Sequence, residues 1–136
     1  MALLDMAEIQ PDLQRDKIIR ILNYRHEKDG NYIMYIIQVQ LDDVRWTIER
    51  RYSDFAAFNK KRFDKMIGKK NSFLPPKKII GNQDDAFLQE RRKDLEKYLR
   101  TTFELEIWLA RKKQQTALPI DLARLLGFTS FLVEWE

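Results

Sequence analysis

The segment ERRYSDF, residues 49–55, holds the side chains in this sequence best suited to grip an anion. It lies where a predicted strand meets a predicted helix. Trp46 and Ile48 share one face of that strand, so Arg51 is expected on the opposite face. A guanidinium is a planar fork of donors that matches a phosphate, and the neighbouring Tyr52 offers a flat face for a sugar-like ring. The alternative is an arginine–carboxylate pair beside a core tyrosine.

A second candidate segment is FLPPKKIIG, residues 73–81. Pro75-Pro76 stiffens the backbone, and Lys77 and Lys78 stand directly before Ile79 and Ile80. Lysine beside exposed aliphatic side chains suits a membrane surface, where the ammonium meets lipid phosphate and the aliphatic groups enter the acyl boundary. The alternative places both isoleucines beneath the long helix that follows.

A further basic residue, Arg91, lies in FLQERRKDLEKYL. Leu88 and Leu95 are three residues before it and four after it, so Arg91 occupies the edge of the apolar face of a helix. A basic residue in that position usually contacts a carboxylate or a bound anion. Arg92 and Lys93 are interpreted as ordinary surface charge.

These segments are expected to be positioned by a sheet followed by helices. Alternating apolar residues and an Asp29-Gly30 turn predict three consecutive antiparallel strands, over residues 16–25, 32–41 and 44–52. Helical spacing and end signals predict three helices, from Ser53 (as its cap) to Met66, from Asp84 to Lys112, and from Pro119 to about residue 128. A sheet first and helices after it predict an α+β fold.

The predicted core faces follow from the same periodicities. The residues expected to share an inner face are Ile33, Tyr35, Ile37, Val39 and Leu41 on the second strand, Val44, Trp46 and Ile48 on the third, Phe55, Phe58, Met66 and Ile67 on the first helix, and Leu88, Leu95, Leu99, Phe103 and Ile107 on the long helix.

Composition limits the alternatives. The chain of 136 residues suits one domain, and it has no Cys and one His, which excludes disulfides, thiolate metal sites and multi-histidine metal sites. No apolar run approaches a membrane-spanning length. The N-terminal stretch is acidic, and its apolar run is too short for a secretory signal. Residues 50–100 contain 15 basic and 7 acidic side chains, although the net charge of the chain is only +4. This basic middle suggests a phospholipid, nucleic acid or acidic protein as partner, or else a solvated helix surface.

The ordered set of RRYSDF at 50–55, LPPKK at 74–78 and ERRKDLEKYL at 90–99 resembles the PX (phox-homology) domain. This is the phosphoinositide-binding module of sorting nexins and related proteins. The resemblance covers residues 17–128, and it leaves 1–16 as a flexible lead-in and 129–136 as an extension. LPPKKIIGN before an acidic-capped helix is most similar to the branch with nischarin, PX-domain pseudokinase-like proteins and RUN-domain sorting nexins.

The resemblance implies a three-stranded antiparallel sheet packed on a helical subdomain, with a Pro-rich loop crossing the pocket. It implies that Arg51 holds the 3-phosphate, that Tyr52 packs under the inositol ring and that Lys77 binds the 1-phosphate. Arg91 would hydrogen-bond the 4- and 5-hydroxyls, and Ile79 and Ile80 would enter the bilayer. Some family members carry a further basic residue after the tyrosine; this chain has a serine there, which removes one phosphate contact.

The resemblance therefore implies a non-catalytic module, without cofactor or metal, that binds phosphatidylinositol 3-phosphate. Such a module recruits its parent protein from the cytoplasm to endosomal membranes, as a peripheral protein with further protein partners. The alternative is a protein-interaction module on the same fold with weak or no lipid binding. Nucleic-acid binding is disfavoured because the aromatic residues follow core periodicity. An enzyme is disfavoured because no Gly-rich phosphate loop and no evident pair of carboxylates are present.

Overall fold

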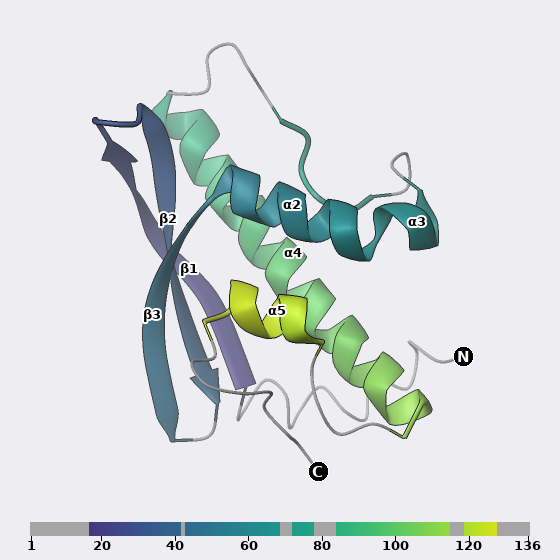
Figure 1. Ribbon diagram of the computed structural model, residues 1–136. Coiled ribbons are helices and arrows are strands. Elements are labelled where there is room, and N and C mark those ends of the chain that lie inside the picture. The colour runs from purple at the N-terminus through teal and green to yellow at the C-terminus, as the bar shows by residue number, and fades with distance from the viewer. Residues whose placement is uncertain (1–16, 42, 69–71, 78–83, 115–118, 128–136) are drawn as a thin grey trace.

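The computed structural model describes residues 17–41, 43–68, 72–77, 84–114 and 119–127. The predicted lead-in, 1–16, and extension, 129–136, lie outside these described residues. The elements in order are β1 (Lys17–Glu27), β2 (Tyr32–Leu41), β3 (Val44–Arg51), α2 (Tyr52–Arg62), α3 (Asp64–Ile67), α4 (Asp85–Lys112) and α5 (Ile120–Leu125) (Figure 1).

The three strands form the predicted antiparallel meander, in the order β1-β2-β3. Ile37 pairs with Ile21 on one side and with Ile48 on the other, so the register aligns the apolar faces of the three strands. All five alternate residues predicted to face inward on β2 are buried or half-buried. β1 continues to Glu27, so His26 lies in the strand and not in the predicted turn.

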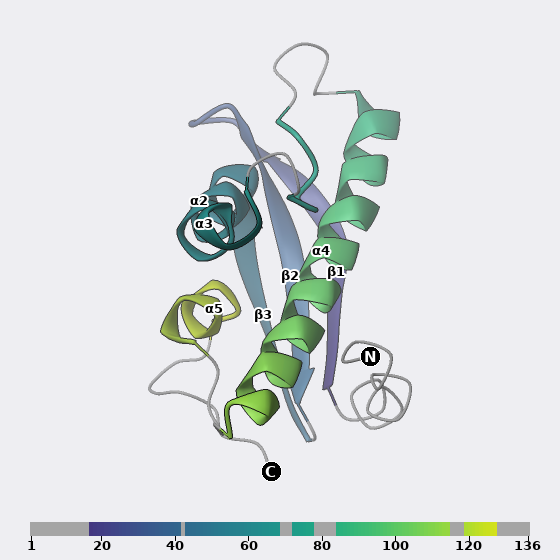
Figure 2. The same cartoon turned by 90° about the vertical axis from the view of Figure 1, so that its right-hand side faces the viewer.

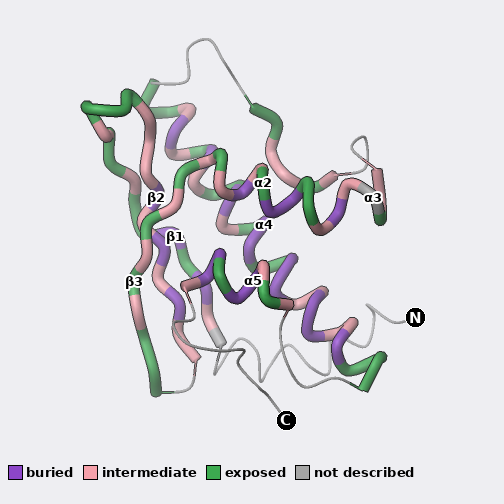
Figure 3. The backbone as a smooth tube through the Cα atoms, viewed as in Figure 1, coloured by how far each residue is buried: buried purple, intermediate pink, exposed green. Residues whose placement is uncertain are grey.

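The helices cover one face of the sheet, with α4 on one side and α2, α3 and α5 on the other (Figure 2). The predicted α4 begins as expected, because the Asp84 carboxylate accepts a hydrogen bond from the backbone N–H of Phe87. The predicted apolar stripe of α4 is buried throughout, and all of it except Leu88 joins the inner face of the sheet in one hydrophobic core (Figure 3).

Arg92 is not the surface charge predicted from the sequence. Its Nη1 donates to the carbonyl oxygen of Ile21 at 2.8 Å, and Glu96 Oε1 accepts from the Ile21 N–H at 2.7 Å. Arg100 Nε donates to the carbonyl oxygen of Ile19 at 2.8 Å. β1 is an edge strand with unpaired backbone groups, and these side chains of α4 satisfy some of them, which protects the edge.

The predicted helix from Ser53 to Met66 is two helices, and its predicted cap is wrong. The chain bends at Phe63, whose ring is fully buried and packs edge-to-face on Phe58 with centroids 5.9 Å apart. Helix α2 begins one residue before Ser53, and Asp54 accepts from the Arg51 N–H instead. Because the bend rotates α3, Met66 is 53% exposed and does not join the core.

The start of β3 and the end of α5 also differ from the prediction. Val44 is 60% exposed at the start of β3, whereas Trp46 is half-buried and its indole N–H donates to the carbonyl oxygen of Leu126 at 2.8 Å. Helix α5 ends at Leu125, shorter than predicted. Gly127 follows at a φ of 81°, where an added Cβ would lie 2.5 Å from Ile48 Cγ2.

Candidate functional site

One cavity brings together the residues that the sequence singled out for anion binding. It has a volume of about 340 Å³ and lies where β2, β3, α2, α4 and the Pro-rich segment meet. Its lining residues are Asn31, Tyr32, Ile33, Tyr35, Arg51, Tyr52, Ser53, Ala56, Lys77, Phe87, Leu88 and Arg91. All four predicted headgroup residues are among them. Ile79 and Ile80, the predicted membrane-inserting residues, lie outside the described residues.

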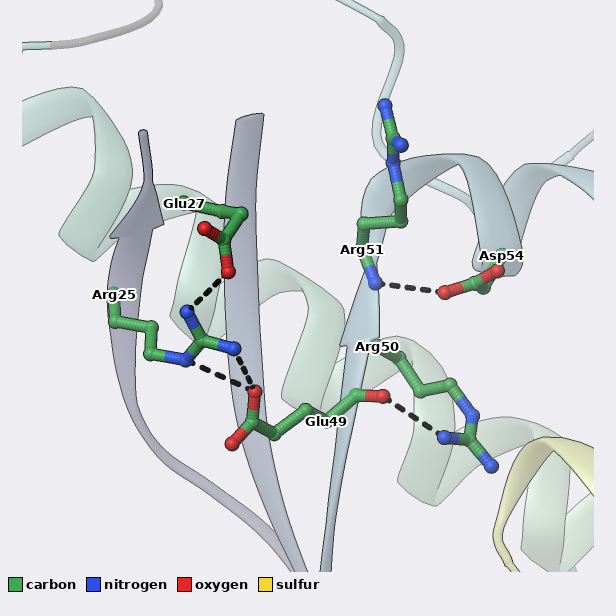
Figure 4. A network of polar contacts seen from close by, with 6 residues as sticks. All are labelled: Arg25, Glu27, Glu49, Arg50, Arg51 and Asp54. Atoms are coloured by element: carbon green, nitrogen blue, oxygen red, sulfur yellow. Dashed lines mark hydrogen bonds and ion pairs between the residues drawn. The ribbon is translucent and has the colours of Figure 1, made fainter. Parts of the chain in front are cut away.

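Arg51 enters the cavity from the last position of β3. Its backbone N–H donates to Asp54 Oδ2 at 2.8 Å, which fixes the strand-to-helix junction. Figure 4 shows its side chain pointing away from the nearby network in which Arg25 pairs with Glu27 and Glu49. The guanidinium carbon lies 3.8 Å from the centroid of the Tyr32 ring. The side chain thus rests on an aromatic face and keeps its N–H groups available.

Arg91 is the most buried of the four predicted headgroup residues, because only 7% of its surface is exposed. Its Nη2 donates to the carbonyl oxygen of Pro76 at 2.7 Å. Its guanidinium carbon lies 4.6 Å from the centroid of the Tyr52 ring and 5.0 Å from that of Phe87. No carboxylate of the described residues pairs with its five N–H groups, so the guanidinium is suited to accept a further partner that supplies acceptor oxygens.

Tyr52, the first residue of α2, connects the cavity to the Pro-rich segment. Its hydroxyl donates to the carbonyl oxygen of Pro75 at 2.5 Å. Burial raises the pKa of the Tyr52 hydroxyl, and the nearby positive charge of Arg91 opposes this only in part. The hydroxyl therefore remains protonated at neutral pH, and the hydrogen bond to the segment is kept.

The Pro-rich segment, residues 72–77, is fastened at its beginning by a buried polar network. The Tyr98 hydroxyl donates to Asn59 Oδ1 at 2.9 Å, and Asn59 Nδ2 donates to Ser72 Oγ at 2.9 Å. The ring of Phe73 packs against Tyr98, with centroids 5.0 Å apart. The other end of the segment carries Lys77, which is exposed at the cavity.

The electrostatics of the cavity are one-sided. None of the described residues that line it is acidic. Within the described part of the chain, no carboxylate pairs with Arg51, Lys77 or Arg91. A buried cation without a counter-charge is costly, so the site is suited to an anion that supplies acceptor oxygens. The predicted alternative, an arginine–carboxylate pair at residue 51, is absent among these residues.

The cavity is arranged for binding and shows no arrangement for metal chemistry. Among the described residues, no three His, Asp or Glu side chains come close enough to hold a metal ion. No described helix has both the length and the apolar composition needed to cross a bilayer.

Sequence reasoning missed Tyr32, Phe87 and Asn59 as contributors to the site. Asn59 was hidden because an isolated polar residue within a predicted helix gives no indication of burial. A signal for Tyr32 did exist. The second and third predicted strands, 32–41 and 44–52, are separated by two residues, and a tight turn there places residue 34 opposite Arg51. Tyr32 is then the diagonal neighbour of Arg51.

Comparisons with known proteins agree with this geometry. The family profile described as PX domain matches residues 38–117. The chain is 38% identical to the kinesin-like protein KIF16B of Homo sapiens over 76 residues, which is 56% of this chain. It is 46% identical to the PX domain-containing protein kinase-like protein of Rattus norvegicus over 68 residues, 48% of this chain. It is 31% identical to sorting nexin-13 of Mus musculus over 107 residues, 73% of this chain.

Among solved structures, the X-ray structure of a designed CISK-PX domain is similar, with a TM-score of 0.51 and 33% sequence identity. The match covers 60% of this chain and 78% of that one. The curated relatives are much longer proteins, since the matched regions span 6% of the kinesin-like protein and 11% of the other two.

Proposed function

The chain belongs to the PX domain family, and we propose that its cavity binds the headgroup of phosphatidylinositol 3-phosphate and so recruits the parent protein to endosomal membranes. PX domains are in general non-catalytic, phosphoinositide-binding modules that direct proteins to membranes. The observation that carries the finer proposal is Arg91, which is almost completely buried and has no carboxylate partner among the described residues.

Each cavity residue has a proposed role. Arg51 holds the 3-phosphate, because its guanidinium lies at the outer wall with its N–H groups available. Lys77 binds the 1-phosphate at the exposed mouth, nearest to the lipid chains. Arg91 donates to the 4- and 5-hydroxyls from the floor, and Tyr52 packs against the inositol ring. These assignments are supported by the presence of all four side chains in the lining of one cavity.

Ile79 and Ile80 are proposed to enter the bilayer beside the bound headgroup. They follow Lys77, a residue that lines the cavity, by two and three residues in the sequence. The apolar side chains gain burial in the acyl region, while the lysines meet lipid phosphates.

Liposome co-sedimentation tests the proposed ligand. The domain is expected to bind vesicles of phosphatidylcholine that contain phosphatidylinositol 3-phosphate, and to ignore vesicles of phosphatidylcholine alone. A panel with each other phosphoinositide measures the preference. If the folded domain binds all vesicles equally, or none, lipid recognition fails as its function and protein interaction on the same fold becomes the better account.

A second experiment separates headgroup binding from bilayer insertion. Changing Ile79 and Ile80 together to Asp removes apolar burial of about 1.5–3 kcal/mol for each side chain and adds repulsion from the anionic surface. Liposome binding is expected to fall strongly, while binding of soluble inositol 1,3-bisphosphate and the melting temperature are kept. A lower melting temperature with loss of both kinds of binding would show that the pair is buried in the core.

A further inference from the structure

Three residues are stacked beside the cavity: Gly30 in the β1–β2 turn, Tyr32 at the start of β2 and Arg51 at the end of β3. The Arg51 guanidinium lies on the ring of Tyr32, with 3.8 Å between the guanidinium carbon and the ring centroid. The same ring also lies close to the backbone of Gly30. A Cβ added to Gly30 would lie 2.1 Å from Cε2 and 2.5 Å from Cδ2 of Tyr32. Gly30 is thus the residue type that leaves room for the ring.

The strand register explains why these residues meet. Met34 is paired with Arg51 at the last position of β3, so β2 extends past the end of β3 by two residues. Tyr32 therefore lies diagonally across from Arg51, within reach of a long side chain. The turn before Tyr32 is closed by Asn31 at a φ of 55°, with its Oδ1 3.3 Å from His26 Nε2.

Arg51 is an exposed side chain at the end of a strand, and it has no carboxylate partner among the described residues to restrict it. Such a side chain would otherwise sample many rotamers, and an anion would have to order it on binding. The Tyr32 ring holds the guanidinium at the cavity before any ligand arrives. This is pre-organisation of a binding residue by a cation–π contact.

We infer that Tyr32 is a positioning residue for the anion site, and that Gly30 acts through it by leaving space for its ring. This inference rests on the proposed binding of a phosphoinositide headgroup and adds a determinant of affinity outside the four predicted residues. Tyr32 does not need to touch the ligand, since its effect passes through Arg51.

The test is a double-mutant cycle on the whole chain, read by titration with soluble inositol 1,3-bisphosphate. Tyr32→Leu removes the ring face, and Gly30→Ala forces the ring to move. Each change is expected to weaken binding about two- to fivefold, the range for an exposed cation–π contact. The double variant is expected to bind no more weakly than Tyr32→Leu alone, because both changes remove one contact.

Two controls separate positioning from general damage. Tyr32→Phe keeps the ring face and is expected to bind as the wild type does. Asp29→Ala alters an exposed side chain in the same turn and is expected to leave both affinity and melting temperature unchanged. In the free wild-type protein, the ring current of Tyr32 should shift the side-chain NMR signals of Arg51 upfield, and Tyr32→Leu and Gly30→Ala should both abolish that shift.

The outcomes are distinct. Non-additive losses with rescue by Tyr32→Phe support the inference. If both single variants bind with wild-type affinity, or if their losses of affinity add in the double variant, the inference is overturned and the proposed function still stands. A wild-type protein that binds neither inositol 1,3-bisphosphate nor any phosphoinositide vesicle would overturn both.

Discussion

Two arginines near opposite ends of α4 have opposite surroundings. Arg91 belongs to α4 itself, and Arg62 of α2 contacts the helix at Glu106, about 22 Å further along the axis at a rise of about 1.5 Å per residue. Near the C-terminal part of the helix, Arg62 of α2 makes a two-point ion pair with Glu106, with Nε–Oε2 at 2.5 Å and Nη2–Oε1 at 2.7 Å. Glu106 is only 1% exposed. Near the N-terminus of the helix, Arg91 meets a carbonyl oxygen and two rings.

This difference in charge pairing suggests that Arg62 contributes to folding stability and Arg91 to ligand binding. At the Arg62 end, hydrogen bonding and attraction to Glu106 raise the pKa of Arg62, and both charges are satisfied within the fold. At the Arg91 end, the described residues supply no counter-charge. Burial of the Arg91 guanidinium therefore costs folding free energy, and a bound anion would offset that cost. The first arginine fastens α2 to α4, and the second is proposed to bind the headgroup.

The largest expected effect is on stability at the paired end. Arg62→Met leaves Glu106 buried without its partner, and this is expected to cost about 3 kcal/mol of folding free energy. A fall in melting temperature of roughly 10 °C would follow for a domain of this size. Headgroup affinity is expected to stay within about twofold of the wild type below that temperature. A large loss of affinity in the folded variant would show that the two ends are coupled.

The next effect is on binding, at Arg51. Arg51→Ala removes charge-assisted hydrogen bonds to phosphate and is expected to weaken binding about 10- to 100-fold. Arg51→Lys is expected to remain weak, because a point charge does not reproduce the guanidinium fork. Isothermal titration with soluble headgroup measures both, and an unchanged melting temperature confirms the fold. Unchanged affinity in Arg51→Ala would move the site elsewhere.

Arg91 and its neighbour Arg92 form a matched pair for a smaller effect. Arg91→Met is expected to weaken headgroup binding about tenfold, with folding stability kept or raised because an uncompensated buried charge is removed. Arg92→Met removes a hydrogen bond to β1 and is expected to lower stability by about 1 kcal/mol while affinity is kept. Thermal melting and headgroup titration on both variants check whether Arg91→Met lowers only affinity and Arg92→Met lowers only stability. The same outcome for both would contradict the assignment of Arg91 to binding and of Arg92 to stability.

The smallest expected effect concerns the anchor of the Pro-rich segment. Ser72 Oγ accepts from Asn59 Nδ2 and from the backbone N–H of Leu74. Ser72→Ala is expected to lower stability by about 1 kcal/mol and affinity by a few-fold, because Pro75 and Pro76 orient Tyr52 and Arg91. Ser72→Thr keeps the hydroxyl and should restore affinity. Full affinity in a destabilised Ser72→Ala would show that the anchor does not position the cavity.

Local pattern was enough to predict much of the fold. The alternation of β2 and the apolar stripe of α4 are periodic over many residues, so the meander and the long helix were predicted within two residues at their described ends. The bend at Phe63 was not, because it depends on where a buried ring finds space between Phe58 and Phe73. Exposed Met66 and Val44 were misassigned for the same reason: periodicity gives a face, and tertiary packing decides where that face ends.

The site shows the same limit in its polar contacts. The sequence indicated Arg51, Tyr52, Lys77 and Arg91, and the structure places all four at one cavity. It singled out Arg91 but took Arg92 for ordinary surface charge, because helical periodicity does not show that the Arg92 side chain reaches the backbone of β1. One points into the cavity and the other to the edge of β1. Their roles depend on neighbours distant in sequence, which a single sequence does not reveal.

The most direct test of the account is an NMR titration of the wild-type domain with soluble inositol 1,3-bisphosphate, observing arginine and lysine side chains as well as the backbone. The account predicts saturable shifts at Arg51, Tyr52, Lys77 and Arg91, and none at Arg62 or Glu106. Shifts confined to the Arg62 end, or no saturable shift anywhere, would contradict the claim that the cations without carboxylate partners form the ligand site.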